Sequence, residues 1–106
     1  MYNDHMSSKL VRDNIPDIIR RSGRKPQTHI ADQTEYDAKL KQKLEEEVKE
    51  FIASDAVEEM ADILEVINAI ADSKNIEAGE LEKIRAEKAQ KNGGFSKKVI
   101  LDAVED

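Results

Sequence analysis

The chain has 106 residues, enough for one domain, and combines 38% charged residues with a formal net charge of −6. This acidic balance argues against nonspecific binding to nucleic acid or to an anionic membrane surface, and the absence of cysteine excludes disulfides and thiolate metal sites. No apolar run is long enough to span a bilayer and the N-terminus lacks the apolar stretch of a signal peptide, so we expect a cytoplasmic protein.

The first predicted element is a short helix from Ile15 to Arg21. Pro16 suits its first turn because a proline lacks only an amide that is unpaired there, and Ser22 and Gly23 suit its end. Residues 24–32 contain a proline and no helical period, which predicts a loop.

Two long helices are predicted next. The first runs from about Thr34, as its N-cap, to about Ile52, and apolar side chains recur along it every three or four residues. Ser54 predicts a break and a cap for the second, which runs from about Ala56 to Asp72. Apolar side chains take more than half the circumference of this second helix. Such a helix must be covered on several sides, by its own bundle or by a second subunit.

A fourth helix is predicted to begin at Glu77 or Glu80 and to end at Asn92, with Gly93 as its stop and Leu81 and Ile84 facing inward. The pattern of residues 95–106 fits a strand or a short helix equally.

These elements predict an all-α antiparallel bundle of about four helices, because short connections favour antiparallel neighbours. We expect residues 1–8 to be a flexible extension and residues 9–106 to be a single helical domain. A chain this short buries a modest share of its surface, so an oligomer, dimer or tetramer, is expected.

Two pairs of acids stand out from the 23 in the chain, most of which must lie on solvated faces. On a helical wheel at about 100° per residue, Glu47 falls inside the apolar stripe and Glu50 lies one turn further along the same edge. Glu59 and Asp62 form a second such pair at the margin of the next helix. A tight turn between antiparallel helices can bring the two pairs together.

Four carboxylates at the edge of a core repel one another unless a cation neutralises them. Oxygen ligands without a nearby Cys or His suit Mg²⁺ first, with Mn²⁺ as a substitute. Mg²⁺ held by carboxylates commonly completes its shell with water and substrate phosphates, which predicts cleavage of a phosphate chain. The alternative is that all four are ordinary surface acids with lysine partners.

These acids also carry a family resemblance. Glu46-Glu47-Val48-Lys49-Glu50 followed by Glu59-Met60-Ala61-Asp62 resembles the E-E-x-x-E … E-x-x-D signature of the all-α nucleotide pyrophosphohydrolases, which include MazG, the dimeric dUTPases, the dCTP pyrophosphatases and phosphoribosyl-ATP pyrophosphohydrolase. KLVRDNIPDII, from Lys9, and the segment Lys91–Phe95 resemble a MazG-like subgroup often labelled phosphoribosyl-ATP pyrophosphohydrolase-like. The resemblance covers roughly Lys9 to Leu101.

The resemblance implies a dimerising helical bundle that cleaves a ribo- or deoxyribonucleoside triphosphate to the monophosphate and pyrophosphate, and it suggests nucleotide-pool house-cleaning as a role. The Mg²⁺ ligands of the family match Glu47, Glu50, Glu59 and Asp62. Glu46, Glu47 and Glu50 match its catalytic acids, and the resemblance leaves Glu46 either to support the metal ligands from outside or to position water. The gap from Glu50 to Glu59 is shorter than in MazG itself, so the substrate is not inferred from MazG.

Five basic residues are candidates for binding the phosphates: Lys9, Arg12, Arg85, Lys88 and Lys91. The last three recur at every third position of the predicted fourth helix, and their alternative role is solubility and favourable charge near a helix C-terminus. His5 and His29 have no partner at ligand spacing, so we expect them to be surface or loop residues.

Two other functions stay open. One is phosphoribosyl-ATP pyrophosphohydrolase activity in histidine biosynthesis, because the residues that recognise a base are poorly diagnostic. The other is a non-catalytic helical dimer or binding module, whose acids would be solvated and whose apolar helix would serve association alone. The sequence specifies neither the base and sugar of a substrate nor the physiological role.

Overall fold

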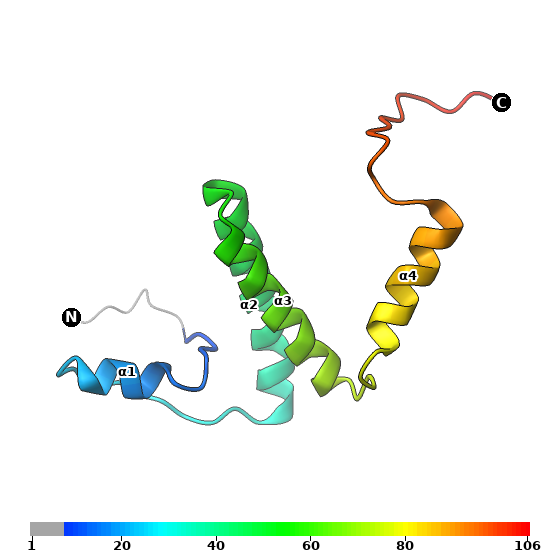
Figure 1. Ribbon diagram of the computed structural model, residues 1–106. Coiled ribbons are helices and arrows are strands. Elements are labelled where there is room, and N and C mark those ends of the chain that lie inside the picture. The colour runs from blue at the N-terminus through cyan, green and yellow to red at the C-terminus, as the bar shows by residue number, and fades with distance from the viewer. Residues whose placement is uncertain (1–7) are drawn as a thin grey trace. The chain divides into compact units, whose positions relative to one another are not determined.

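The structure, a computed structural model, describes residues 8–106, so the expected flexible extension lies outside the described residues except for Ser8. Figure 1 shows helices α1 (Ile15–Arg21), α2 (Gln33–Ser54), α3 (Val57–Ser73) and α4 (Glu80–Asn92). Residues 8–106 contain no strand, which confirms the all-α class. Within the same residues, no helix is both long and apolar enough to cross a membrane.

The chain forms two compact units. The first ends at Lys74 and contains α1, α2 and α3, whereas the second spans Asn75–Asp106 and contains α4.

Helices α2 and α3 pack side by side as an antiparallel hairpin (Figure 1). The amide of Asp55, in the left-handed conformation, donates to the carbonyl of Phe51 and ends α2. The amide of Ala56 then donates to Ser54 Oγ at 3.2 Å. The predicted cap was wrong, because Ser54 is the last residue of α2 and Ala56 is the N-cap of α3, without a side-chain cap hydrogen bond. This two-residue connection is the break that Ser54 predicts, and it sets the last turns of α2 against the first turns of α3.

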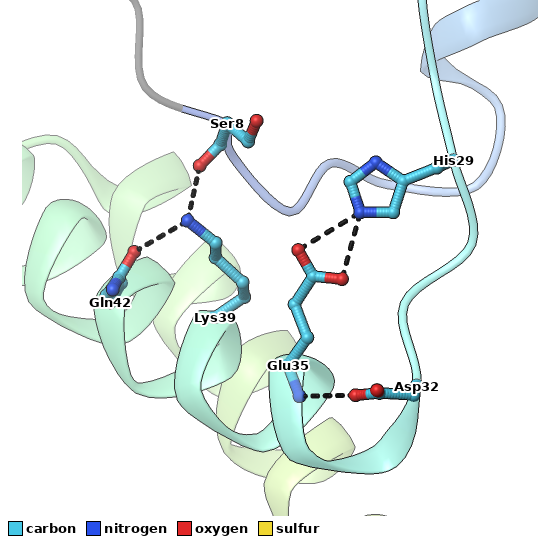
Figure 2. A network of polar contacts seen from close by, with 6 residues as sticks. All are labelled: Ser8, His29, Asp32, Glu35, Lys39 and Gln42. Atoms are coloured by element: carbon cyan, nitrogen blue, oxygen red, sulfur yellow. Dashed lines mark hydrogen bonds and ion pairs between the residues drawn. The ribbon is translucent and has the colours of Figure 1, made fainter.

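The N-cap of α2 differs from the prediction. Asp32 Oδ1 accepts a hydrogen bond from the amide of Glu35 at 2.9 Å, so Asp32 is the cap and Thr34 lies inside the first turn (Figure 2). Asp and Thr are both favoured as helix caps. Asp32 has the extended backbone of an N-cap residue, and its side chain reaches the amide of Glu35, which has no partner within the helix.

Two side chains form the buried apolar core of the hairpin, Leu40 from α2 and Val66 from α3. Three apolar residues of α3, by contrast, are exposed: Val57, Met60 and Leu64. They lie within about 60° of one another on a helical wheel, on the side opposite Val66. We call them the apolar face of α3. Within the first unit α2 therefore covers one side of α3 and leaves the apolar face of α3 exposed.

The open end of the hairpin is closed by three polar side chains, which we call the polar clasp. Gln33 Nε2 donates to Asp37 Oδ1 and to Ser73 Oγ, both at 2.8 Å. Ser73 Oγ in turn donates to Asp37 Oδ1. These hydrogen bonds, that of Ser73 first, lower the pKa of Asp37. The clasp joins the first turns of α2 to the last residue of α3.

The second unit is less regular than predicted. Helix α4 has the predicted end at Asn92 and Gly93, but it buries no residue, and Leu81 and Ile84 are exposed rather than inward. Residues 95–106 form neither a strand nor a helix, so both predictions for them were wrong. The apolar residues of this segment include the consecutive run Val99–Leu101 and follow the regular period of neither element.

Candidate metal centre

Three carboxylates converge near the turn of the hairpin, and we call them the acid triad. Glu47 and Glu50 lie one turn apart on α2, and Glu59 lies in the first turn of α3. One oxygen from each of the three lies within 4.8 Å of the other two. Glu47 is buried, with 7% of its surface exposed, Glu59 is half-buried and Glu50 is exposed. The triad therefore opens to solvent at Glu50.

The surroundings of the triad disfavour its negative charge. Burial raises the pKa of Glu47 to about 7, helped by a side-chain hydrogen bond with Glu50. Burial also raises the pKa of Glu59, and the charges of Glu50 and Asp62 add to the rise. A carboxylate in low dielectric beside other carboxylates is more stable protonated, or neutralised by a cation.

One oxygen of the triad is unsatisfied. Glu59 Oε2 is buried and has no hydrogen-bond partner among the described residues. A buried carboxylate oxygen without a donor carries a desolvation penalty that nothing in its surroundings offsets. The donor set consists of carboxylate oxygens, the type that Mg²⁺ and other hard cations prefer. The residues therefore fit a hard divalent cation.

Two lysines hold Glu46 beside the triad. Lys43 Nζ lies 3.2 Å from Glu46 Oε1 and 4.0 Å from Glu47 Oε2, and its side chain is only 20% exposed. Lys9 Nζ lies 3.6 Å from the same Glu46 oxygen. Lys43 was missed by the sequence analysis, although its i,i+3 and i,i+4 spacing to the two acids was a signal for it.

Asp62, the fourth predicted ligand, is paired with a cation of the chain. An Arg12 guanidinium nitrogen donates to Asp62 Oδ1 at 2.7 Å, between residues 50 positions apart. Its charge still reaches the triad, since it raises the pKa of both Glu47 and Glu59.

The other predicted phosphate-binding residues belong to the second unit. Arg85 donates to both carboxylate oxygens of Glu82, at 2.9 and 2.7 Å, so its fork is occupied within α4. Lys88 and Lys91 are exposed on the same helix. The structure thus brings Lys9 and Arg12 to the predicted acids and leaves the three residues of α4 in a unit of their own.

Two polar contacts tether the segments before α2 to that helix (Figure 2). Lys39 Nζ donates to the Ser8 carbonyl oxygen at 2.7 Å. His29 Nε2 lies 2.9 and 3.0 Å from the two oxygens of Glu35, so His29 has a partner that the sequence analysis did not find. His5 lies outside the described residues. The first contact holds Ser8 against α2, and the second holds the loop before α2 against its first turn.

An open hollow beside α2 adjoins the triad. Its lining consists of Lys9, Gln42, Glu45, Glu46, Lys49 and Glu50. Glu50 belongs to both the hollow and the triad, while Lys9 and Lys49 bring two cations to it. Three carboxylates line the same hollow, so an anionic ligand there would depend on a bound cation as well as on the two lysines.

Comparison with known proteins yields a partial relative. A protein of Mycolicibacterium smegmatis (strain ATCC 700084 / mc(2)155), described as uncharacterized, is 50% identical over 48 residues. The match covers 45% of this chain and 49% of that protein, so it spans about half the length of each. No family model matches the chain. No solved structure matches it either.

Proposed function

We propose that the acid triad, with Asp62 as a fourth carboxylate, binds Mg²⁺, for which Mn²⁺ can substitute. The buried and unpartnered Glu59 Oε2 is the observation that carries this proposal. A divalent cation there would stabilise the charged form of Glu47 and Glu59, whose pKa is raised first by burial and then by the neighbouring carboxylates. The cation, when bound, supplies positive charge that screens a phosphate chain and lowers the pKa of a bound water.

On this basis the chain is a Mg²⁺-dependent nucleotide pyrophosphohydrolase. The reaction adds water across the α–β phosphoanhydride bond of a nucleoside triphosphate and yields the monophosphate and pyrophosphate. This activity rests on the resemblance of the E-E-x-x-E and E-x-x-D runs to the MazG-like enzymes, together with the juxtaposition of the two runs in the hairpin.

The residues of the chain have distinct roles in this proposal. Glu47 and Glu50 hold the cation together with Glu59, and Glu46, fixed by two lysines, accepts a hydrogen bond from the attacking water. Lys9 and Arg12 bind the phosphates from the N-terminal segment, and the hollow that Lys9 shares with Glu50 receives the phosphate chain. Arg85, Lys88 and Lys91 of α4 are the other predicted phosphate-binding residues, and this proposal gives them no contact with the site in the hairpin.

The apolar face of α3 supports a second proposal, that the protein is a homodimer. Val57, Met60 and Leu64 are 70%, 52% and 61% exposed on the helix that also carries Glu59. A second hairpin packed on this face would complete a four-helix bundle, as in the resembling family. Light scattering after size exclusion is expected to give a dimer for the wild type and a monomer for Leu64→Glu, whereas exposed Glu65→Gln serves as the control. A monomeric wild type would exclude this arrangement.

The test of the activity is pyrophosphate release from ribo- and deoxyribonucleoside triphosphates and from phosphoribosyl-ATP, with Mg²⁺ and with EDTA. Mg²⁺-dependent release by the wild type that is lost in Glu50→Gln supports the proposal. Glu58→Gln is the matched control, since Glu58 is an exposed acid next to Glu59 and outside the triad. If phosphoribosyl-ATP is turned over far faster than the triphosphates, the protein is instead a phosphoribosyl-ATP pyrophosphohydrolase. No release from any substrate by the folded protein would favour the binding module.

A further inference from the structure

Two cations compete for the carboxylate of Asp62, the proposed metal ion and the guanidinium of Arg12. Asp62 completes the predicted set of four metal ligands, yet its Oδ1 accepts a 2.7 Å hydrogen bond from Arg12. The pair is accessible to solvent, with 58% of the Arg12 side chain and 33% of the Asp62 side chain exposed. A guanidinium keeps its positive charge at every physiological pH, so it neutralises Asp62 in the way that a bound metal would.

The segment that carries Arg12 is also attached to α2 elsewhere. Lys39 Nζ holds the Ser8 carbonyl oxygen at 2.7 Å, and Lys9 Nζ lies 3.6 Å from Glu46 Oε1. Neither contact involves a residue of the acid triad or Asp62. Arg12 can therefore leave Asp62 while its segment stays beside the site.

We infer that Arg12 is a counter-ion of the metal site that the cation displaces: it occupies Asp62 when no metal is bound, and metal binding frees its guanidinium for the phosphates of the nucleotide. The inference rests on the proposed function and adds an order of binding, in which the metal binds before the nucleotide. The planar fork of Arg12 matches a phosphate as well as a carboxylate, so the freed side chain has a new partner close by.

The opposite role for Arg12 makes the opposite prediction. If Arg12 held Asp62 in place for the metal, its removal would weaken metal binding, as the loss of a group that orients a ligand does. If Arg12 competes with the metal, its removal strengthens binding. The sign of the change in Mg²⁺ affinity therefore separates the two roles without any measurement of activity.

The experiment is isothermal titration calorimetry with Mg²⁺ alone, on the wild type and Arg12→Gln. We expect Arg12→Gln to bind Mg²⁺ about two- to fivefold more tightly, the range that loss of an exposed ion pair implies. Lys9→Gln removes the same charge from the same segment but not from Asp62, so its affinity should rise less. In an Asp62→Asn background, Arg12→Gln should have no effect, because the shared carboxylate is gone.

Three outcomes would overturn this inference alone while Mg²⁺ still binds the wild type: unchanged or weaker binding by Arg12→Gln, an equal gain in Lys9→Gln, or a gain that persists in the Asp62→Asn background. Wild-type protein that binds no Mg²⁺ would overturn the proposed metal site, and the inference with it. The failure of the inference is thus distinguishable from the failure of the function on which it rests.

Discussion

The α2–α3 hairpin has an acidic group towards each end, and the two differ in how their charge is satisfied. In the polar clasp, Asp37 accepts hydrogen bonds from Ser73 and Gln33, and its pKa is lowered. In the acid triad, the nearest groups include other carboxylates, the pKa of Glu47 and Glu59 is raised, and one buried oxygen has no partner in the described part of the chain. An acid whose neighbours donate to it stabilises the fold, whereas acids that face one another create a demand for a cation.

The largest effect expected from this difference is on catalysis. Glu47→Gln should reduce Mg²⁺-dependent pyrophosphate release by roughly a thousandfold, because a metal ligand that carries charge is lost. Asp37→Asn, which alters an acid of the same helix in the clasp, should leave the rate within about twofold of the wild type. Steady-state rates of the two variants give this comparison, and similar losses in both would remove the distinction between the two ends of the hairpin.

The pH dependence of stability without metal sharpens the same comparison. The pKa of Glu47 is raised from 4.5 to about 7, so its contribution to stability is fully present below pH 4.5 and is lost as the pH rises through 7. A shift of this size corresponds to a loss on the order of 3 kcal/mol. Urea unfolding in EDTA from pH 4.5 to 8 should show a clearly larger loss in the wild type than in Glu47→Gln, in which Glu59 still has a raised pKa. Parallel curves for the two proteins would mean that Glu47 does not carry the effect.

The polar clasp is expected to matter for stability alone. Asp37→Ala should lower the Tm by a few degrees, because the hydrogen bonds from Ser73 and Gln33 are lost. The increase in Tm that Mg²⁺ gives the wild type by binding the folded state should be unchanged in this variant. Differential scanning calorimetry with and without Mg²⁺ measures both quantities, and loss of the Mg²⁺ increment would tie the clasp to the metal site.

The smallest effects are expected among the basic residues. Lys9→Gln should raise the KM for a nucleoside triphosphate by about three- to tenfold, in line with the loss of a charge-assisted contact. Arg85→Gln should change the KM by less than about twofold, because Glu82 already occupies its guanidinium. A larger increase for Arg85→Gln would mean that α4 supplies the main contact to the phosphates.

The helices were predictable because their signals are local. Pro16 and the Ser22-Gly23 stop gave the bounds of α1, and Gly93 gave the end of α4. Ser54 marked the turn of the hairpin. The cap of α2 was misplaced by two residues, since Asp32 and Thr34 both suit the position and only backbone conformation separates them. The segment after α4 was mispredicted because its apolar residues carry no consistent period, and all of Phe95, Val99, Ile100, Leu101 and Val104 are exposed.

The candidate site likewise has contacts that the sequence predicted and contacts that it did not. The meeting of Glu47 and Glu50 with Glu59 follows from helix geometry and one tight turn, so the wheel was sufficient to predict it. The pairing of Arg12 with Asp62 joins an irregular segment to a helix across 50 residues, and no spacing rule encodes such a contact. His29 was assigned no partner for the same reason, since the loop conformation that brings it to Glu35 has no sequence period.

The central claim is that the acid triad holds a divalent cation, and its most direct test is calorimetric titration of the metal-free protein with Mg²⁺. We predict saturable binding of Mg²⁺ at the triad in the wild type and no binding in Glu59→Gln, where a neutral amide replaces the carboxylate with the unpartnered oxygen. Glu58→Gln should bind as the wild type does. Absence of binding in the wild type, or equal binding by Glu59→Gln, would contradict the claim.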